Sequence, residues 1–293
     1  MTDARPSTSL PPVRVVTDST ACLPPAAPGG ATPLVVPLRV VAPDGEHREG
    51  VDLDPVAVAE RIAAGELLTT SQPPPEDLAA AYRDAVRSGA RAVVAVHLSG
   101  ALSGTVGAAA RAGQRAMVPV RVVDSRTVAM GLGFAAQAAA ACAAAGADAA
   151  HVAERAAQVA RAGRTLFLVD SLDHLRRGGR LSAGAAALGT ALGVRPLLEI
   201  RDGRIQTVQR VRTRAAALDR LVTLAVEHAA GCAAPAVAVH HLGAEDRAAD
   251  VAQRLAGELG VAPVVTPVSA VLGAHAGPGA LAVVVTDVGG HAH

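Results

Sequence analysis

The sequence predicts a two-domain α/β protein, with a parallel sheet in the N-terminal domain and a mixed sheet in the C-terminal domain. Between residues 13 and 162, short β-branched runs alternate with longer Ala-rich segments of helical character, which is the pattern of βαβ units. Beyond residue 163 the pattern changes, because Leu197–Ile200 and Ile205–Val211 flank an Asp202-Gly203 turn typical of an antiparallel hairpin. A chain of 293 residues is long enough to bury two cores.

The N-terminal domain is expected at residues 13–162, after a Pro-rich leader (1–12) that we expect to be disordered. Apolar, β-branched runs predict its strands at Val13–Thr17, Leu34–Val41, Ala92–Leu98 and Val120–Val123. Pro37 argues that the second of these is an edge strand. Helices are predicted at Val56–Ala64, Glu76–Ser88, Val106–Arg115, Phe134–Ala145 and Asp148–Ala162. Asp54-Pro55 resembles an N-cap followed by proline, and Pro73, Pro74 and Pro75 hold the chain extended before the second helix.

The C-terminal domain is expected at residues 163–286, followed by a frayed tail (287–293). Besides the hairpin, its strands are predicted at Leu166–Val169, Ala236–His240, Val264–Pro267 and Ala280–Thr286. Its helices are predicted at Ala215–Ala230 and Glu245–Glu258, with a further Ala/Gly/Leu-rich helix directly after Arg180. His275 is expected in a loop that contains three glycines and a proline.

Composition excludes several classes of function. The net charge is +1 and aromatic residues make up 1% of the chain, so neither a basic field nor stacking platforms for nucleic acid are present. No apolar run has the length of a membrane span, which leaves at most transient membrane contact. The first residues lack the apolar segment of a signal peptide, and the widely spaced Cys22, Cys142 and Cys232 predict free thiols in the cytoplasm.

Polar residues follow three of the predicted parallel strands, at Asp18-Ser19, Ser99–Thr105 and Asp124-Ser125. Ligands of parallel sheets gather at the carboxyl ends of strands, so we expect these segments to meet at one edge. No Walker-type phosphate loop, dinucleotide fingerprint or metal-ligand spacing is found in the sequence, and we predict neither a cofactor nor a metal.

Four groups are candidates for a binding site: Thr69-Thr70-Ser71 before the prolines, Ser103 and Thr105 in a Gly-rich loop, Arg180 after two glycines, and His275. Each also has a structural interpretation. Ser and Thr before proline usually form caps or turns, a Gly-rich loop can be topology, a lone Arg is often solvated and a lone His often structural. A cation beside a region of small apolar side chains suits an amphiphile with one anionic end.

The order and wording of several motifs resemble the DegV family of bacterial fatty-acid-binding proteins. The matching segments span about Val13–Val285 and are VVTDSTACLP, TTSQPPPEDL, HLSGALSGTVGAAARA, VVDSRTVAMGLG, VDSLDHLRRGGRLS, LGVRPLLEIRDGRI and GAHAGPGALAVVV. One departure is Gly100, which stands where the family often has a second serine.

This resemblance implies that a long-chain fatty acid lies in a cleft between the two domains. Its carboxylate would be bound by Thr70, Ser103, Arg180 and His275. A supporting loop set would consist of Ser71, Gly104, Thr105, Gly179, Gly277 and Gly279. The small-residue helices after Ser103 and after Arg180 are expected to line a tunnel without aromatic walls, and Arg176 and Arg177 are interpreted as surface charges.

The resemblance also implies a partner. In the best-known members a separate fatty-acid kinase converts the bound acid to an acyl-phosphate, a precursor for phospholipid synthesis, so the binding protein itself has no catalytic residue. Two alternatives remain open: a lipid-sensing regulatory module without a kinase, and a serine hydrolase that uses Ser103 or Ser19 with His275 and a nearby Asp. The hydrolase lacks a G-x-S-x-G elbow. Chain length, unsaturation and oligomeric state are not determined by these patterns.

Overall fold

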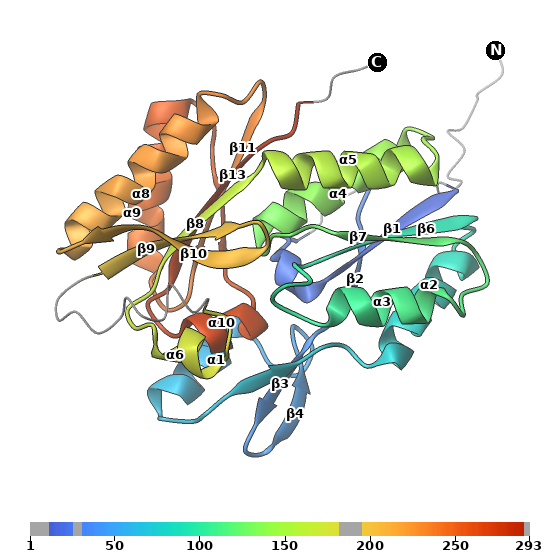
Figure 1. Cartoon of the computed structure of the whole chain (residues 1–293), viewed down its shortest axis with the longest axis horizontal. Coiled ribbons are helices and arrows are strands. Elements are labelled where there is room, and N and C mark those ends of the chain that lie inside the picture. Colours follow the sequence, from blue (N-terminus) through green and yellow to red (C-terminus); the bar gives the residue numbers. More distant parts are fainter. Residues whose placement is uncertain (1–11, 26–30, 182–194, 290–293) are drawn as a thin grey trace, which may run out of the picture.

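The computed structural model describes residues 12–25, 31–181 and 195–289. Two sheets lie beside each other and a third, smaller sheet lies below them (Figure 1). The predicted leader, the small-residue helix after Arg180 and the end of the predicted tail fall largely or wholly outside these ranges. Asp287 and Gly289 are inside them, and the Asp287 carboxylate accepts hydrogen bonds from the backbone of Ala233, Ala234 and Gly289.

The N-terminal sheet is parallel, as predicted. Its strands, in spatial order, are β2 (Leu34–Val36), β1 (Val13–Asp18), β6 (Ala92–His97) and β7 (Val120–Asp124). One face packs against α2 (Pro75–Arg87) and α3 (Thr105–Gly113), and the other against α4 (Met130–Ala144) and α5 (Ala149–Ala162). Because both faces are covered, the central strands are almost continuously apolar.

The C-terminal sheet is mixed, which is also as predicted. Its order is β10 (Arg204–Val211), β9 (Arg195–Arg201), β8 (Arg164–Leu168), β13 (Leu281–Asp287), β11 (Pro235–His241) and β12 (Val264–Pro267). Helices α8 (Arg214–Ala229) and α9 (Glu245–Leu259) cover its outer face (Figure 1). Helices α4 and α5 contact β13 on the other face, so one apolar core joins both sheets.

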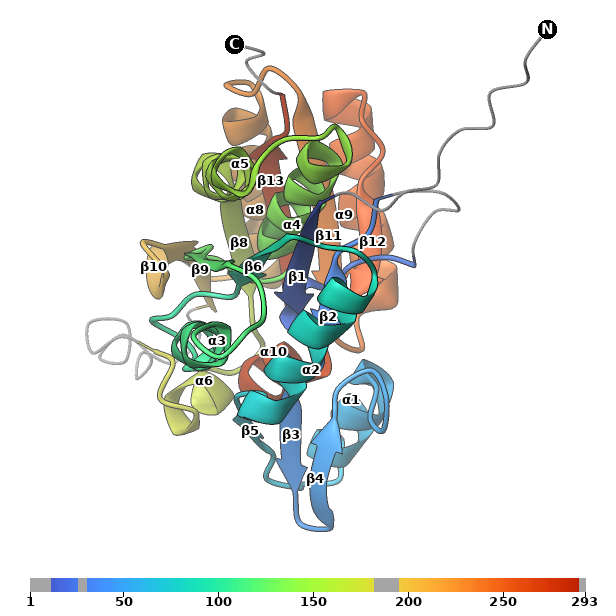
Figure 2. The same cartoon turned by 90° about the vertical axis from the view of Figure 1, so that its right-hand side faces the viewer.

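The prediction of one strand at Leu34–Val41 is wrong. Pro37 has no N–H to continue the ladder, and the chain divides there into β2 and β3 (Arg39–Ala42). Strand β3 joins a separate antiparallel sheet, of order β4–β3–β5, with β4 (Gly45–Arg48) and β5 (Thr69–Ser71). This small sheet and α1 (Pro55–Ala63) lie at the lower edge of the molecule (Figure 2).

The expectation of a loop around His275 is also wrong, because His275 lies in the last turn of α10 (Ala270–Ala276). Another short helix, α6 (Asp173–Arg177), precedes Arg180. Ser269 caps the N-terminus of α10 by accepting a hydrogen bond from Leu272 N, and Gly277 is the C-cap that follows its last residue. The glycines that suggested a loop instead lie in and directly after this helix.

A buried carboxylate holds α10 against the N-terminal half of the chain. Glu49 Oε1 accepts from Val271 N at 3.0 Å, and its other oxygen accepts from Ser19 Oγ at 2.5 Å. Glu49 is only 5% exposed, and this burial raises the pKa of its carboxyl group. The two hydrogen bonds offset part of the free-energy cost of removing the carboxylate from water. The bond to Val271 N connects segments that are more than 200 residues apart in sequence.

Replacing Glu49 with Gln is expected to change the pH dependence of stability. Because the carboxyl pKa is raised in the folded protein, its contribution to stability is present at low pH and lost as the pH rises through the folded-state pKa. Glu49→Gln removes this loss, so its free energy of unfolding relative to the native protein should rise with pH across that window. Urea unfolding at a series of pH values measures the difference. Glu258→Gln, at an exposed position on α9, is the matched control.

Candidate binding site

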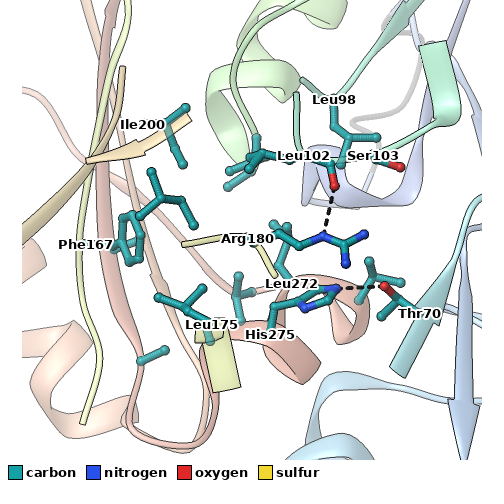
Figure 3. A pocket seen from close by; sticks show the side chains of 18 of the residues that line it. Thr70, Leu98, Leu102, Ser103, Phe167, Leu175, Arg180, Ile200, Leu272 and His275 are labelled. Atoms are coloured by element: carbon teal, nitrogen blue, oxygen red, sulfur yellow. Dashed lines mark hydrogen bonds between the residues drawn. The ribbon is translucent and has the colours of Figure 1, made fainter. Parts of the chain in front are cut away.

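A cavity of about 310 Å³ lies between the two sheets and α10. Thr70, Ser103, Arg180 and His275 all line it, and Figure 3 shows their side chains gathered at one end. The remaining wall is mostly apolar, and it is formed chiefly by Leu38, Leu98, Leu102, Val128, Ala129, Phe167, Leu175, Ile200, Ile205, Val268, Val271 and Leu272.

The loop that carries Ser103 is positioned by a fully buried aspartate. Asp18, at the end of β1, accepts hydrogen bonds from His97 Nδ1 and from Leu98 N, both at 3.0 Å. On the other side of the same loop, Gly100 N donates to Asp124 at 3.1 Å. The carboxyl ends of these three parallel strands therefore meet at one edge of the sheet, as predicted from the sequence.

Ser103 lies directly before α3, whose N-cap is Gly104. Its hydroxyl is 2.9 Å from Thr105 Oγ1 and accepts from Thr105 N at 3.3 Å. The N-terminus of a helix carries a partial positive charge, which favours an anion at this position. Gly104 and Ser71 of the expected supporting set also line the cavity, and the buried Thr105 supports Ser103 from behind.

Arg180 reaches the cavity across the boundary between the two halves of the chain. Its Nε donates to the carbonyl of Leu102 at 3.0 Å and its Nη1 donates to the carbonyl of Gly178. The bend that directs it there follows α6, where Gly179 adopts a φ of +68°. The guanidinium lies between Ser103 on one side and His275 on the other (Figure 3).

His275 and Thr70 form a direct hydrogen bond, with 2.7 Å between Nε2 and Oγ1. Thr70 belongs to β5, so the bond joins the small sheet to the last turn of α10. Burial and then the neighbouring Arg180 charge lower the pKa of His275 to about 4. The imidazole is therefore neutral at neutral pH, and Arg180 is the charged member of the group.

Gly178 is important to this arrangement, although it was not among the expected supporting residues. A Cβ at this position would lie 2.3 Å from His275 Nδ1, far inside van der Waals contact. The Gly178-Gly179-Arg180 sequence indicated that glycine is needed here, but the two glycines have different roles. Gly178 allows the close packing of His275, and only Gly179, with its positive φ, allows the bend. Gly277 and Gly279 follow α10 with φ of +78° and +79°, and they lie against His174 and Asp170 rather than in the cavity wall.

Two expectations about the tunnel wall are not met. The alanines of α3 that are buried pack against α2 and the sheet, in a core that includes Ala108, Ala109 and Tyr82, and do not line the cavity. One wall residue, Phe167, is aromatic. The second small-residue helix lies outside the described residues.

The geometry gives no support to a serine hydrolase. Within the described ranges, His275 hydrogen-bonds Thr70, whereas the Ser103 hydroxyl contacts Thr105 and the Ser19 hydroxyl donates to Glu49. No group of His, Cys, Asp and Glu residues suited to a metal ion occurs in the part of the chain that the structure describes. In that same part, no helix is long and apolar enough to cross a membrane.

The fold is an α/β arrangement of two main sheets and one small sheet, and its cavity is mostly apolar with Thr70, Ser103, Arg180 and His275 at one end. A model of the DegV family, described as an uncharacterised protein family, matches residues 12–287. The chain belongs to the DegV family. A DegV domain-containing protein of Streptomyces coelicolor is 45% identical over 277 residues, which cover 94% of this chain and 98% of the relative.

Solved structures of the family have the same fold. The crystal structure of DegV from Bacillus subtilis, described as a fatty acid binding protein, matches with a TM-score of 0.86 and 33% identity, and covers 95% of this chain and 100% of its own. A DegV family protein from Thermus thermophilus, described by its fatty acid binding, matches with a TM-score of 0.85 and 31% identity, over 94% of this chain and 99% of its own.

We expect NMR titration of the ligand-free protein to place the His275 pKa near 4. Its unfolded-state value is higher, so His275 contributes stability at neutral pH that is lost as the pH falls from about 6.5 towards 4. Arg180→Gln should raise the pKa without restoring the usual value, because burial is the larger cause. Arg91→Gln is the control, because this exposed residue directly precedes the first residue of β6, whereas Ser103 follows the other end of that strand. It should leave the His275 pKa unchanged. An unperturbed His275 in the native protein would contradict the prediction.

Gly178→Ala is expected to displace the His275 ring and to destabilise the protein by about 1–3 kcal/mol, as overpacking does. Gly179→Ala is the matched control, because its Cβ meets no atom within 4 Å and its cost of about 1–2 kcal/mol comes from backbone strain alone. Thermal unfolding measures both effects. The imidazole signals of His275 should shift in the first variant only, and equal shifts in both would show that the close approach is unimportant.

Proposed function

We propose that this protein binds a long-chain fatty acid in the cytoplasm and presents it to a separate fatty-acid kinase, which forms the acyl-phosphate. The observation that carries this proposal is one mostly apolar cavity in which Thr70, Ser103, Arg180 and His275 lie together at one end. Both DegV structures described above belong to proteins described by fatty acid binding. The three unpaired cysteines agree with a reducing compartment.

The cavity meets both requirements of a fatty acid. Each buried methylene contributes about 0.8 kcal/mol, so a chain of about fifteen gives on the order of 12 kcal/mol before ordering costs. A buried carboxylate without partners would cancel much of that gain. Arg180 supplies a permanent positive charge, and the hydroxyls of Thr70 and Ser103 can donate to the carboxylate oxygens.

The end of the cavity that would hold the carboxylate, here called the head-group end, is also accessible to a kinase. Gln72, Gly104 and Gly179 around it are exposed, so the carboxylate would remain within reach of a second protein. Because the imidazole of His275 is neutral before binding, an anion placed beside it would favour proton uptake. The carboxylate would thus be held by one fixed charge and by groups whose hydrogen bonds can be exchanged.

A long-chain acid should be released from protein purified from bacteria when it is denatured and analysed by mass spectrometry. In delipidated protein, Arg180→Gln should weaken fatty-acid affinity by roughly tenfold to a hundredfold, because a charged hydrogen bond is worth about 1.5–3 kcal/mol. Thr70→Val with Ser103→Ala should also weaken it. Arg177→Gln, an exposed cation on α6, should bind normally. Native affinity in the Arg180 and double variants would overturn the site assignment.

The kinase step needs its own test, because a lipid-sensing module would use the same pocket. The loaded protein is mixed with ATP and the fatty-acid kinase of the same bacterium, and acyl-phosphate is trapped with hydroxylamine. Hydroxamate formation that depends on the binding protein supports the carrier role. Normal fatty-acid binding without hydroxamate would favour the sensing module.

A further inference from the structure

The end of the cavity opposite the polar groups is formed by the C-terminal sheet. Figure 3 shows Phe167 and Ile200 on this side, away from Thr70 and Ser103. On β8, Thr165 and Phe167 share one face of the strand and both line the cavity. The register pairs Phe167 with Ala282 and pairs Thr165 with Val284 and Ile200. Ala282 lines the cavity and Val284 does not, so the cavity ends near the row of Thr165 and Ile200.

Thr165 is held in this position by a second threonine. Its hydroxyl lies 3.1 Å from the hydroxyl of Thr127, and the two residues are 4% and 7% exposed. Helix α4 packs closely on the pair: a Cβ on Gly131 would lie 2.5 Å from Thr127 Oγ1 and 3.0 Å from Thr165 Oγ1. The pair therefore has little room to move towards α4.

A second cavity lies directly behind this pair. Its volume is about 690 Å³, Ile200 and Thr127 line it, and Arg126, Arg164 and Glu199 make it strongly charged. Arg164 and the buried Glu199 form an ion pair at 3.0 Å. A hydrocarbon chain that passed the threonine pair would meet charged groups and water, so it would gain no further burial.

We propose that Thr165, backed by Thr127 and flanked by Ile200, is the end wall that limits the length of the fatty-acid chain. This inference rests on the proposed function, because it concerns the depth of the same pocket. The limit is steric: each methylene that no longer fits loses its burial, which is about a fourfold loss in affinity. The two hydroxyls satisfy each other and make a compact barrier between the apolar cavity and the charged one.

The test compares dissociation constants for a series of saturated acids of increasing length, measured on delipidated protein. Thr165→Leu extends the side chain into the cavity, so the longest acid that the native protein binds well should lose roughly tenfold in affinity, while short acids keep theirs. Thr165→Ala should shift the preference towards longer chains. The double variant Thr127→Val with Thr165→Val keeps the shape of both side chains and should keep the native length profile.

Each outcome has a definite meaning. An unchanged profile in a folded Thr165→Leu protein overturns the end wall, and if that variant does not fold, an unchanged profile in Thr165→Ala does so. A profile that shifts in the double valine variant as much as in Thr165→Leu overturns the steric limit in favour of recognition by the hydroxyls. Failure of the native protein to bind any acid of the series refutes the proposed function instead.

Discussion

The hydrogen bond between Thr70 and His275 joins the two halves of the chain at the polar end of the cavity. It depends on contacts that lie elsewhere. Thr70 is placed by the pairing of β5 with β3, α10 is held by the buried Glu49 carboxylate, and the ring of His275 fits only because Gly178 has no side chain. The site is therefore a property of how the elements meet rather than of any one motif.

The electrostatics of the site follow from the same closeness. Burial lowers the pKa of His275 and the neighbouring Arg180 guanidinium lowers it further, so the imidazole is neutral at neutral pH. A site with one permanent cation and several neutral hydrogen-bonding groups suits a single carboxylate. The opposite end of the cavity excludes charge, since the Thr127–Thr165 pair separates it from the ion-paired Arg164 and Glu199.

Long segments with clear periodicity were predictable because local burial determines their pattern. The parallel arrangement of β1, β6 and β7 and the antiparallel pairing of β9 with β10 are both confirmed. Short elements were not predictable: β4 has no apolar alternation, and α10 is a short helix of seven residues followed directly by Gly277. Such helices have weak intrinsic preference and are stabilised by tertiary contacts, here those of Glu49 with the N-terminus of α10.

By itself the sequence determined the α/β class, the change from a parallel to a mixed sheet, and four candidate groups that contain Thr70, Ser103, Arg180 and His275, because turn chemistry and β-branched runs act locally. The choice of these four residues as a carboxylate site came from the resemblance of their motifs to the DegV family. Only the tertiary structure decided that these four line one cavity, that His275 is neutral, and that Thr165 lies at the far end. Those features arise from strand register and from contacts between residues far apart in the chain, which local sequence patterns do not encode.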